Sequence, residues 1–466
     1  MMNNNEKTNE YQPTEVEEAR EALLKRINRP LEIVRVHLLN ADGRILAEDI
    51  RAPFSVPSFP KSAMDGYAVW SEDVQSATKD NPVRLRVVGE CLAGETACHS
   101  ERAERVEEAF REDERPAATA CHSERTERVE ESFREDERPA AAACHSERAE
   151  RVEESFPAGT ALRIMTGAQV PEGYDAVVRQ EDTDCGEDVV TIYKGVSQWT
   201  NYCKVGEDIL KGNVVLQKGS RIGRIEAGVL ASLGIDVVPV YRALSVSIIS
   251  TGTELREVGQ PLQAGAIYNS IAYTLSASVR EAGFIANCRI VPDDALKIRR
   301  ALEEALTDSD VVITTGGVSV GKKDLLPEVL EQIGAERIFQ RVNIQPGTPT
   351  IGSVKNGIPI LSLSGNPYAA LVNFDLYFWP VAAKITGCDT FQPEERLMIS
   401  GSEYPKKNKQ RRFLRAREEG GKVYLPVKSH ASSVLSNLLD CNCYIDLPAD
   451  TEIRPGDPVR VVRMPG

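Results

Sequence analysis

The sequence predicts a multidomain protein in which one α/β domain, with a parallel sheet, is combined with β-rich domains. Its 466 residues suit about three domains, at roughly 150 residues each. From 245 to 388, apolar strand runs alternate with amphipathic helices, which indicates parallel strands joined by right-handed crossovers. Residues 52–96, 157–210 and 389–466 instead carry short strand runs separated by turns, which is typical of small β-domains.

The composition narrows the classes of function that the sequence allows. No apolar run approaches the length of a membrane span and the N-terminus is polar, so we expect a cytoplasmic protein with no membrane partner. The formal charge of −14 opposes general binding of DNA or RNA, because neutralisation of phosphates dominates such affinity. An anionic ligand must therefore be held by local basic groups and backbone N–H groups.

Histidine and cysteine are too sparse to carry the chemistry. Three of the five histidines and three of the ten cysteines fall in one repeated segment. No C-x-x-C pair is present, and the pair Cys441 and Cys443 lacks a second cluster at metal-site spacing. We therefore expect free thiols, and we assign the chemistry to carboxylates, hydroxyls and backbone groups.

The repeated segment has a period of 23 residues, with full copies at 98–120 and 121–143 and a partial copy at 144–156. Each copy is too polar to bury a core, and a solenoid would need an apolar stacking face that is missing here. We interpret it as a surface insertion at about 97–156, which the host domain tolerates because lengthening a loop costs little free energy.

The remaining elements follow in chain order. Residues 14–28 have helical apolar spacing, and strand-like runs at 32–38 and 44–50 flank a turn. Residues 221–243 have the pattern of a helix that ends at Gly234 and is followed by a strand. The α/β region then begins with the strand run SVSIIST.

Four loops follow strand ends in the α/β region, and parallel topology places them on one edge of the sheet, where ligands bind in such folds. They supply glycines, hydroxyls and carboxylates, and they span 252–254, 292–294, 316–324 and 364–367. Glycine loops that lead into helices expose N–H groups to anions, and carboxylates from separate loops can share Mg²⁺ with ligand phosphates. Taken singly, Asp293, Asp294 and Asp324 are as well explained as helix N-caps. As a set on one edge of the sheet, they favour a ligand-binding site over helix capping.

The third loop almost matches a phosphate-binding P-loop. Gly316, Gly321 and Lys322 have the spacing of G-x-x-x-x-G-K, but Lys323 follows where Ser or Thr would reach a magnesium ion. A pyrophosphate cradle is therefore expected here without the machinery of a nucleoside triphosphatase.

Five motifs, in order, resemble the molybdopterin molybdenumtransferase family, the MoeA type related to the E-domain of gephyrin. They are PKSAMDGYAV (60–69), RIMTGA (163–168), STGTE (250–254), GGVSVGKKD (316–324) and SGNP (364–367). The resemblance spans nearly the whole chain outside the insertion. It implies an elongated homodimer with its active site at the subunit interface, and a reaction of adenylylated molybdopterin with molybdate and Mg²⁺ that yields molybdenum cofactor and AMP.

The resemblance also implies a domain plan and a partner. The four domains are a linker and dimerisation domain (10–51 with 211–243), a β-rich domain with the insertion (52–210), a molybdopterin-binding α/β domain (244–388) and a C-terminal β-domain (389–466). The α/β domain resembles the adenylyltransferase that acts one step earlier, which is a possible partner.

Site residues are carried over where the motifs match. Catalytic roles are expected for Asp65, Thr166, Asp208, Glu254, Asp324 and Arg341, and metal binding for Glu254, Asp293 and Asp324. Turn formation or helix capping explains the presence of Asp65, Thr166 and Asp208 as simply as a catalytic role does. Contacts with the pterin pyrophosphate or molybdate are expected from Gly316, Gly317, Ser319, Gly321, Ser364, Gly365, Asn366, Pro367, Thr348, Arg411, Arg412, Arg415 and Ser432.

Three departures from the family pattern bear on the oxyanion site. Where the family usually has K-P-G-K-P, this chain has QPGTP at 345–349, so that Gln345 and Thr348 replace two lysines. The preceding basic residue remains as Arg341, and SGNP stands where many members have P-G-N-P. Two lost charges weaken capture of a dianion, although the basic run 406–415 can compensate with one of its arginines.

Other functions remain open at this level. A pyrophosphate hydrolase of a pterin or nucleotide would use the same loops without molybdate. A non-catalytic pterin-binding scaffold would not need converging carboxylates, and a tungstate-handling paralogue has the same sequence signature.

Overall fold

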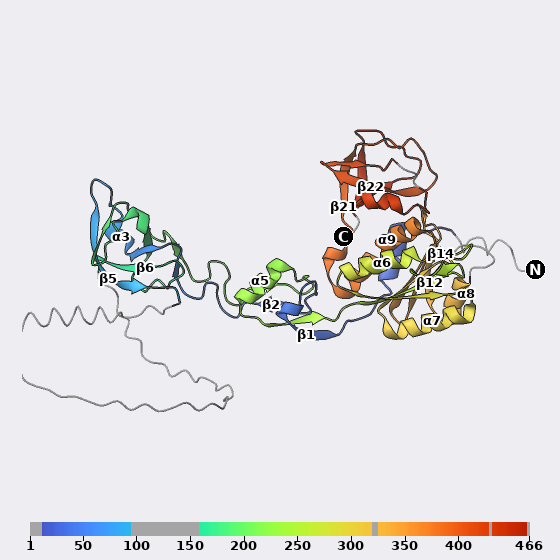
Figure 1. Ribbon diagram of the computed structural model, residues 1–466, viewed down its shortest axis with the longest axis horizontal. Coiled ribbons are helices and arrows are strands. Elements are labelled where there is room, and N and C mark those ends of the chain that lie inside the picture. The colour runs from blue at the N-terminus through green and yellow to red at the C-terminus, as the bar shows by residue number, and fades with distance from the viewer. Residues whose placement is uncertain (1–11, 95–157, 319–324, 428–430, 464–466) are drawn as a thin grey trace, which may run out of the picture. The chain divides into compact units, whose positions relative to one another are not determined.

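The computed structural model describes residues 12–94, 158–318, 325–427 and 431–463. The chain forms two compact units, one of Met1–Arg51 with Val214–Gly466 and one of Ala52–Asn213. Figure 1 labels the principal elements of both units. Within the described ranges, no helix combines the length and the hydropathy that a membrane crossing requires.

The unit of Ala52–Asn213 is built on a five-stranded sheet of order β7-β4-β6-β5-β8. The strands are β4 (Gly66–Val69), β5 (Val83–Cys91), β6 (Thr160–Ile164), β7 (Ala176–Arg179) and β8 (Val189–Ile192), with α3 (Ser71–Val74) after β4. A short pair, β3 (Lys61–Ser62) with β9 (Tyr202–Cys203), and η2 (Gln180–Asp182) complete it. Tyr67, Val69 and Ile192 lie in the core.

A small linker segment of the other unit pairs β1 (Ile33–His37) with β11 (Val237–Tyr241) and β2 (Ile50–Arg51) with β10 (Val214–Leu216). Helix α5 (Arg224–Ser232) and η1 (Leu38–Asn40) pack on these pairs. The strand predicted at 44–50 is wrong over most of its length. Ile45 and Leu46 form only isolated bridges, because each meets a different partner, Arg221 and Val240.

The α/β domain has a six-stranded sheet of order β15-β12-β16-β20-β19-β17. The first four strands are parallel, as predicted, and they are β15 (Ile285–Val291), β12 (Ser245–Thr251), β16 (Val311–Thr315) and β20 (Ile358–Leu363). The parallel arrangement does not extend to one edge, where β19 (Ile351–Lys355) runs antiparallel to both β20 and β17 (Glu336–Gln340). The tight turn at Asn356 and Gly357, both with positive φ, makes this reversal possible.

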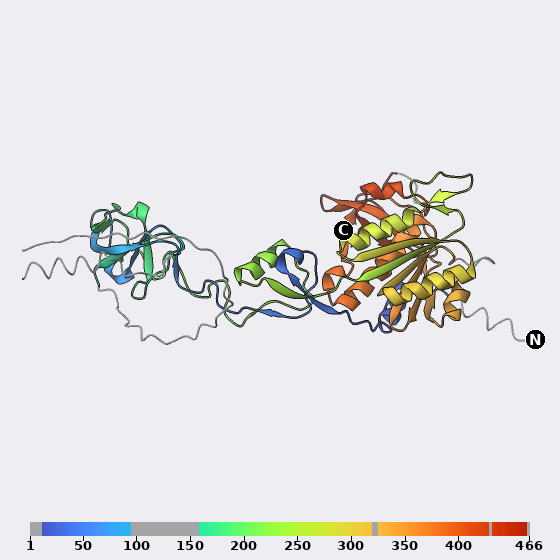
Figure 2. The same cartoon turned by 60° about the horizontal axis from the view of Figure 1, so that its bottom comes forward.

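Helices cover both faces of this sheet, as the alternation predicted. On one face α6 (Ser270–Glu281), α9 (Pro367–Thr386) and α2 (Val16–Leu24) share a core with Val246, Ile313 and Leu361. On the other face α7 (Ala295–Asp308) and α8 (Leu326–Gln332) pack against Val312 and Ile360. Figure 2 views the sheet between these two helical layers. A short parallel pair, β13 (Leu255–Arg256) with β14 (Ile267–Tyr268), extends the loop after β12.

The C-terminal domain is a closed β-barrel. Its strands pair in the circular order β22-β23-β21-β25-β24-β22, with bounds Glu395–Ser400 for β21, Arg411–Glu419 for β22, Lys422–Tyr424 for β23, Cys443–Leu447 for β24 and Pro458–Arg463 for β25. Strand β18 (Ile344–Gln345) of the preceding domain adds to β22, while η3 (Asp389–Phe391) and η4 (Ser436–Asp440) lie in the connections. Closure leaves the barrel strands few unpaired edges.

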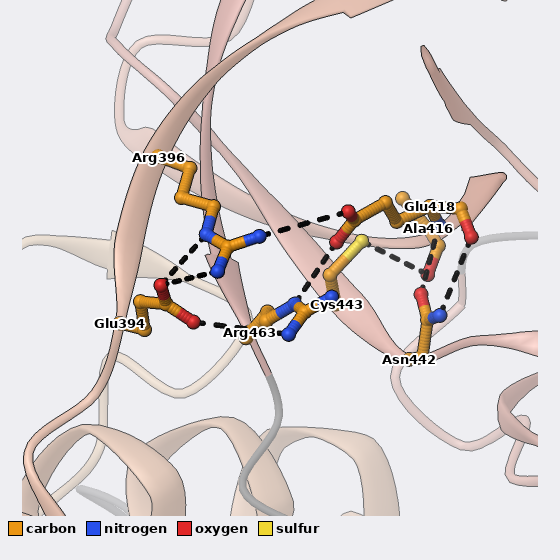
Figure 3. A network of polar contacts seen from close by, with 7 residues as sticks. All are labelled: Glu394, Arg396, Ala416, Glu418, Asn442, Cys443 and Arg463. Atoms are coloured by element: carbon orange, nitrogen blue, oxygen red, sulfur yellow. Dashed lines mark hydrogen bonds and ion pairs between the residues drawn. The ribbon is translucent and has the colours of Figure 1, made fainter. Parts of the chain in front are cut away.

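An ion-pair network crosses the barrel surface. Figure 3 shows Arg463 and Arg396 between the same two carboxylates, Glu394 and Glu418, with Arg463 Nε 3.0 Å from Glu418 Oε2. Pairs this exposed contribute little each, about 0–1 kcal/mol. We therefore regard the network as support for the junction between the strands rather than as a ligand site.

Helix α9 joins the two domains through buried hydrogen bonds. The Tyr444 hydroxyl of the barrel donates to Asp375 Oδ2 at 2.6 Å, and Trp379 Nε1 donates to Asp375 Oδ1 at 3.0 Å. The Tyr368 hydroxyl donates to the Phe413 carbonyl at 2.7 Å. In each of these three hydrogen bonds, loss of one partner would leave the other buried and unsatisfied.

We predict that Asp375 makes stability depend on pH. Burial raises the pKa of Asp375 to about 7, whereas an unfolded aspartate titrates near about 4. Between these values the folded chain binds a proton that the unfolded chain lacks. The stabilisation by Asp375 is therefore complete below about pH 4 and is lost as the pH rises through 7.

Urea unfolding at pH 5 and pH 8 tests this. From pH 5 to pH 8 the free energy of unfolding of the wild-type protein should fall by about 2–3 kcal/mol more than that of Asp375→Asn. The size follows because each unit of pKa difference corresponds to about 1.4 kcal/mol. Equal losses in the two proteins would contradict the assignment.

Candidate functional site

The carboxyl ends of four parallel strands bring the predicted loops together. The register aligns Thr251 with Val291 and Thr315 with Leu363, so the loops after β12, β15, β16 and β20 start at one edge. The Gly316 amide donates to the Leu363 carbonyl at 3.1 Å. Of the predicted residues in the third loop, Gly316 and Gly317 are described, whereas Ser319, Gly321 and Asp324 lie outside the described residues.

Close packing explains why glycine stands at this edge. Gly316 has a φ of +90°, and a Cβ there would lie 2.5 Å from the Thr251 carbonyl oxygen. A Cβ at Gly365 would contact the Gly316 Cα at 3.6 Å. The backbones of the two loops therefore lie in contact, and at Gly316 no larger residue fits, which leaves backbone groups accessible in the way that anion-binding loops require.

The SGNP loop forms the start of α9 and meets the barrel. The Asn366 amide donates to the Ser364 hydroxyl at 3.2 Å, and Pro367 occupies the first helical turn. The Tyr368 amide donates to the Ser432 carbonyl at 3.1 Å, so the predicted residue Ser432 lies beside Ser364-Gly-Asn-Pro367. The positive end of the α9 dipole therefore points to the same edge as the glycine loops.

Two predicted acidic residues stand on neighbouring loops. Asp293 Oδ2 accepts hydrogen bonds from the Thr253 amide at 3.1 Å and the Thr253 hydroxyl at 3.2 Å. The exposed Glu254 carboxylate folds back over Gly252, within 2.9 Å of the position that a Cβ would take there. Thr253 was not predicted, although its place between Gly252 and Glu254 in the quoted motif was a usable signal.

These oxygens fit part of a magnesium site. Mg²⁺ prefers carboxylate oxygens and completes its shell with water and substrate phosphates. Among the residues that the structure describes, no three His, Cys, Asp or Glu side chains form a metal cluster, and Asp324, the third predicted ligand, is not one of them. Glu254 and Asp293 thus supply oxygen donors of the kind that Mg²⁺ prefers, and the described residues alone do not complete a site.

The 345–349 loop is held from two sides. The Asn373 amide group of α9 donates to the Gly347 carbonyl at 2.9 Å, and the Val342 amide donates to the Thr348 carbonyl at 2.9 Å. Arg341, just before the loop, has a φ of +76°, a backbone conformation that L-residues rarely adopt. The loop thus has a defined shape, and neutral residues occupy its predicted oxyanion positions.

The three candidate arginines have different surroundings. Arg411 forms a bidentate pair with Asp446, at 2.6 and 2.7 Å, and also contacts Glu17 at 2.9 Å. Arg415 is fully buried, donates to the carbonyls of Ala431 and Val434, and stacks over the Tyr368 ring at 3.7 Å. Arg412 is half-buried and donates to Asn408 Oδ1 at 3.0 Å.

The unit of Ala52–Asn213 holds the other predicted residues. Pairing of β4 with β6 brings the two turns together, and Asp65 Oδ1 accepts from the Thr166 hydroxyl at 2.6 Å and the Thr166 amide at 2.7 Å. These bonds lower the pKa of the partly exposed Asp65 carboxyl. Asp208 lies in a turn of this unit, with an exposed side chain and an amide that donates to Val56.

Comparison with known proteins covers the whole chain. Residues 14–234 match the MoeA N-terminal region (domain I and II), 247–384 match a probable molybdopterin binding domain, and 398–464 match the MoeA C-terminal region (domain IV). The Haemophilus influenzae protein named molybdopterin molybdenumtransferase is 32% identical over 440 residues, which is 93% of this chain and 94% of that protein. The Bacillus subtilis protein of the same name is 34% identical over 419 residues, 88% of this chain and 84% of that protein.

A solved structure agrees with the sequence matches. The crystal structure of the molybdopterin biosynthesis MoeA protein from Pyrococcus horikoshii OT3 has a TM-score of 0.75 and 27% identity to this chain. The match covers 97% of this chain and all of that one. The agreement therefore includes both compact units and the barrel.

We predict that Gly316→Ala destabilises the protein by about 1–3 kcal/mol, because the methyl group meets the Thr251 carbonyl and the positive φ is strained. Thermal unfolding measures the change. Gly228→Ala is the matched control, since a Cβ there meets nothing within 4 Å and helix α5 favours alanine. Equal stability of the two variants would refute the packing argument.

We predict that Thr166→Val raises the pKa of Asp65, since the Thr166 hydroxyl is the largest cause of its lowering. Carbon-13 NMR titration of the carboxyl group measures the midpoint. Thr166→Ser retains the hydroxyl and should titrate as the wild type does. An unchanged midpoint in Thr166→Val would show that the hydroxyl bond is absent in solution.

Proposed function

The chain belongs to the molybdopterin molybdenumtransferase (MoeA) family, and from this premise we propose that it reacts molybdate with adenylylated molybdopterin and releases AMP. Its role is in molybdenum cofactor biosynthesis, as a transferase. One observation carries the proposal: the Ser432 segment of the barrel lies against the SGNP loop, at the edge where Gly316 and Gly365 meet. Pterin and oxyanion would thus meet at one place.

The pyrophosphate is proposed to bind at the glycine loops. Gly317 and Gly365 would offer backbone N–H groups, Gly316 would shape the turn while its amide bonds to the Leu363 carbonyl, and the start of α9 at Asn366 and Pro367 offers a positive dipole end. Ser364, Ser319 and Gly321 are assigned to the same cradle. Binding there holds the adenylate phosphorus in one orientation, which is the main catalytic contribution expected of phosphoryl-transfer sites.

Magnesium is proposed as the cofactor. Glu254 and Asp293 would hold it, together with Asp324 and the substrate phosphates. When bound there, Mg²⁺ neutralises negative charge on the pyrophosphate as AMP leaves. The hydrogen bonds from Thr253 fix the Asp293 carboxylate and leave its second oxygen available for this task.

Asp65, Thr166 and Asp208 are proposed as further catalytic residues. The lowered pKa keeps Asp65 ionised at neutral pH, so that it can accept a proton or a hydrogen bond. Arg341, Thr348, Ser432 and one barrel arginine would orient molybdate. The oxygen that attacks the adenylate phosphorus, and the molybdopterin phosphate that is displaced as AMP forms, are then positioned by the protein rather than activated by a strong base.

The assembly is proposed to be a cytoplasmic homodimer with its active site at the subunit interface. Exposed apolar side chains on and around the β13–β14 extension support such an interface, among them Val258, Leu262 and Ile267. The adenylyltransferase of the preceding step is the proposed supplier of the substrate.

Release of AMP from adenylylated molybdopterin, with Mg²⁺ and with or without molybdate, tests the function. We expect release that depends on molybdate. Release without molybdate would indicate a pyrophosphate hydrolase, and no release from folded protein would indicate a pterin-binding scaffold.

A double substitution tests the assignment of Glu254 and Asp293 as magnesium ligands. Glu254→Gln with Asp293→Asn should raise the Mg²⁺ concentration for half-maximal rate at least about tenfold, because two anionic ligands are lost. Glu257→Gln removes an exposed carboxylate from the same extension and should leave that concentration unchanged. An unaltered Mg²⁺ requirement in the double variant would refute the assignment.

A further inference from the structure

We propose that Trp199 and Lys204 form a binding site for an amino-substituted heteroaromatic ring that carries phosphate. The choice of ring rests on the proposed function, because the adenine and the pterin of adenylylated molybdopterin are both rings of this class. The site belongs to the unit of Ala52–Asn213 alone. It lies where 201–203 pair with 61–63, beside the turn that carries Asp65.

The backbone at Trp199 has a conformation that tryptophan rarely adopts. Residues 197–200 form a tight turn, in which the Thr200 amide donates to the Ser197 carbonyl at 3.1 Å. Trp199 is the third residue of this turn and has a φ of +68°, where glycine or asparagine is usual. A bulky residue in this region costs free energy and persists only where the surrounding structure enforces it. Turn formation therefore does not explain why tryptophan stands here.

Packing in the core does not explain it either. Trp199 is 42% exposed, whereas Trp379 is 3% exposed. The Ala63 amide donates to the Asn201 carbonyl at 3.0 Å, so the segment that carries Met64 adjoins the turn, and Met64 is 43% exposed. Large apolar side chains on two adjoining segments are thus held in solvent, which indicates a contact surface rather than part of the core.

Hydrogen bonds to strand β7 and its preceding residue fix the position of the turn. The Trp199 amide donates to the Asp175 carbonyl at 2.8 Å, and the Val177 amide donates to the Thr200 carbonyl at 2.9 Å. The Asn201 side-chain amide donates to the Val177 carbonyl at 3.0 Å. The backbone that carries the indole is therefore ordered before a ligand arrives, which reduces the entropy lost on binding.

Lys204 marks an accessible face of the indole. Its Nζ lies over the Trp199 ring, 4.2 Å from the ring centroid, and the Tyr202 ring meets the indole in a T-shaped contact at 5.0 Å. Lys204 is exposed, and an ammonium group at the surface keeps its water. The face beneath it is therefore not closed by packed side chains. A planar ring can stack on this face while the flexible lysine moves aside.

The charge of Lys204 is available to an anion. Among the residues that the structure describes, its ammonium group forms no ion pair. The nearby Glu207 carboxylate accepts a hydrogen bond from the Lys204 backbone amide at 3.0 Å instead. A lysine that is free of a carboxylate and adjoins an aromatic ring suits a ligand with both a planar ring and a phosphate group.

Asp65 provides an acceptor for the amino group of such a ring. It stands two residues beyond Ala63, whose amide contacts the turn. Both hydrogen bonds that it accepts within the described part of the chain, from the Thr166 amide and hydroxyl, go to Oδ1. The partly exposed carboxylate thus keeps Oδ2 for a ligand. Adenine and pterin each carry an amino group that can donate to it.

Fluorine NMR of the protein labelled with 5-fluorotryptophan tests the site, because the chain has three tryptophans. AMP and neopterin phosphate are added in separate titrations. We expect the Trp199 resonance, assigned by its loss in Trp199→Leu, to shift with at least one of them. The Trp379 resonance is the internal control and should stay in place, since that indole is buried and bonded to Asp375.

The substitution Lys204→Gln separates the charge from the ring. It should raise the AMP or neopterin phosphate concentration at the midpoint of the Trp199 shift about threefold, because a surface charge pair is lost. The midpoints for adenosine and neopterin, which lack phosphate, should not change. Lys211→Gln removes another exposed lysine from the same ribbon and is the matched control.

The substitution Trp199→Gly tests a purely structural role of the indole. Glycine relaxes the positive φ, so the melting temperature should equal or exceed that of the wild type. Equilibrium dialysis should nevertheless show at least about fivefold weaker binding, in Trp199→Gly and Trp199→Leu, for the phase whose midpoint matches the NMR titration. Stacking of a base on an aromatic side chain accounts for a change of this size.

The outcomes separate the two possible rings. A shift with AMP alone assigns the site to adenine, a shift with neopterin phosphate alone assigns it to the pterin, and a shift with both supports the shared chemistry. An unshifted Trp199 resonance with both ligands would overturn the proposal. So would an effect of Lys204→Gln no larger than that of Lys211→Gln, or a lowered melting temperature of Trp199→Gly, which would indicate packing.

Ring binding and AMP release are measured independently, because the NMR titrations require no turnover. If the protein releases no AMP from adenylylated molybdopterin, yet the Trp199 resonance shifts with either ligand, the transferase function fails and the ring site stands. If AMP release depends on molybdate but the Trp199 resonance responds to neither ligand, the ring site fails and the function stands.

Discussion

Helix α9 is the element on which the rest of the ligand edge depends. It is almost entirely buried, and its side chains reach the sheet, the 345–349 loop and the barrel. The hydrogen bond between Tyr444 and Asp375 can form only if the barrel sits at one place along the helix. That position sets the Ser432 carbonyl against the Tyr368 amide and thereby completes the edge with a segment from another domain.

Charge is distributed over this edge in a way that the net charge of −14 does not reveal. The glycine loops and the positive end of the α9 dipole lie at this edge, the carboxylates of Glu254 and Asp293 stand on the loops after β12 and β15, and Arg411 and Arg412 of the barrel pair in register with β18. Arg411, at the barrel strand nearest this edge, is committed to the Asp446 carboxylate. Local arrangement of charges, rather than the net charge, therefore decides which ions suit each part of the edge.

The sequence predicted the parallel core and the loops that follow its strands, because alternation of strands and helices is a local pattern with one common topology. It missed the antiparallel edge, although Asn356-Gly357 between two apolar runs was a hairpin signal. The Asp65–Thr166 bond joins residues 101 positions apart, so pairing of β4 with β6 had to be known first. The sequence could not distinguish the surroundings of Arg411, Arg412 and Arg415. Their contacts are with Asp446, Asn408 and Tyr368, which no sequence motif links to the basic strand.

Hydrogen–deuterium exchange with and without adenylylated molybdopterin shows whether the substrate binds where the sheet edge meets the barrel. We expect slower exchange in peptides that contain 252–254, 316–318 and 364–368, and in those from 431–434, because these backbone groups become covered together. Protection confined to other parts of the chain, with exchange at these four segments unchanged, would contradict it.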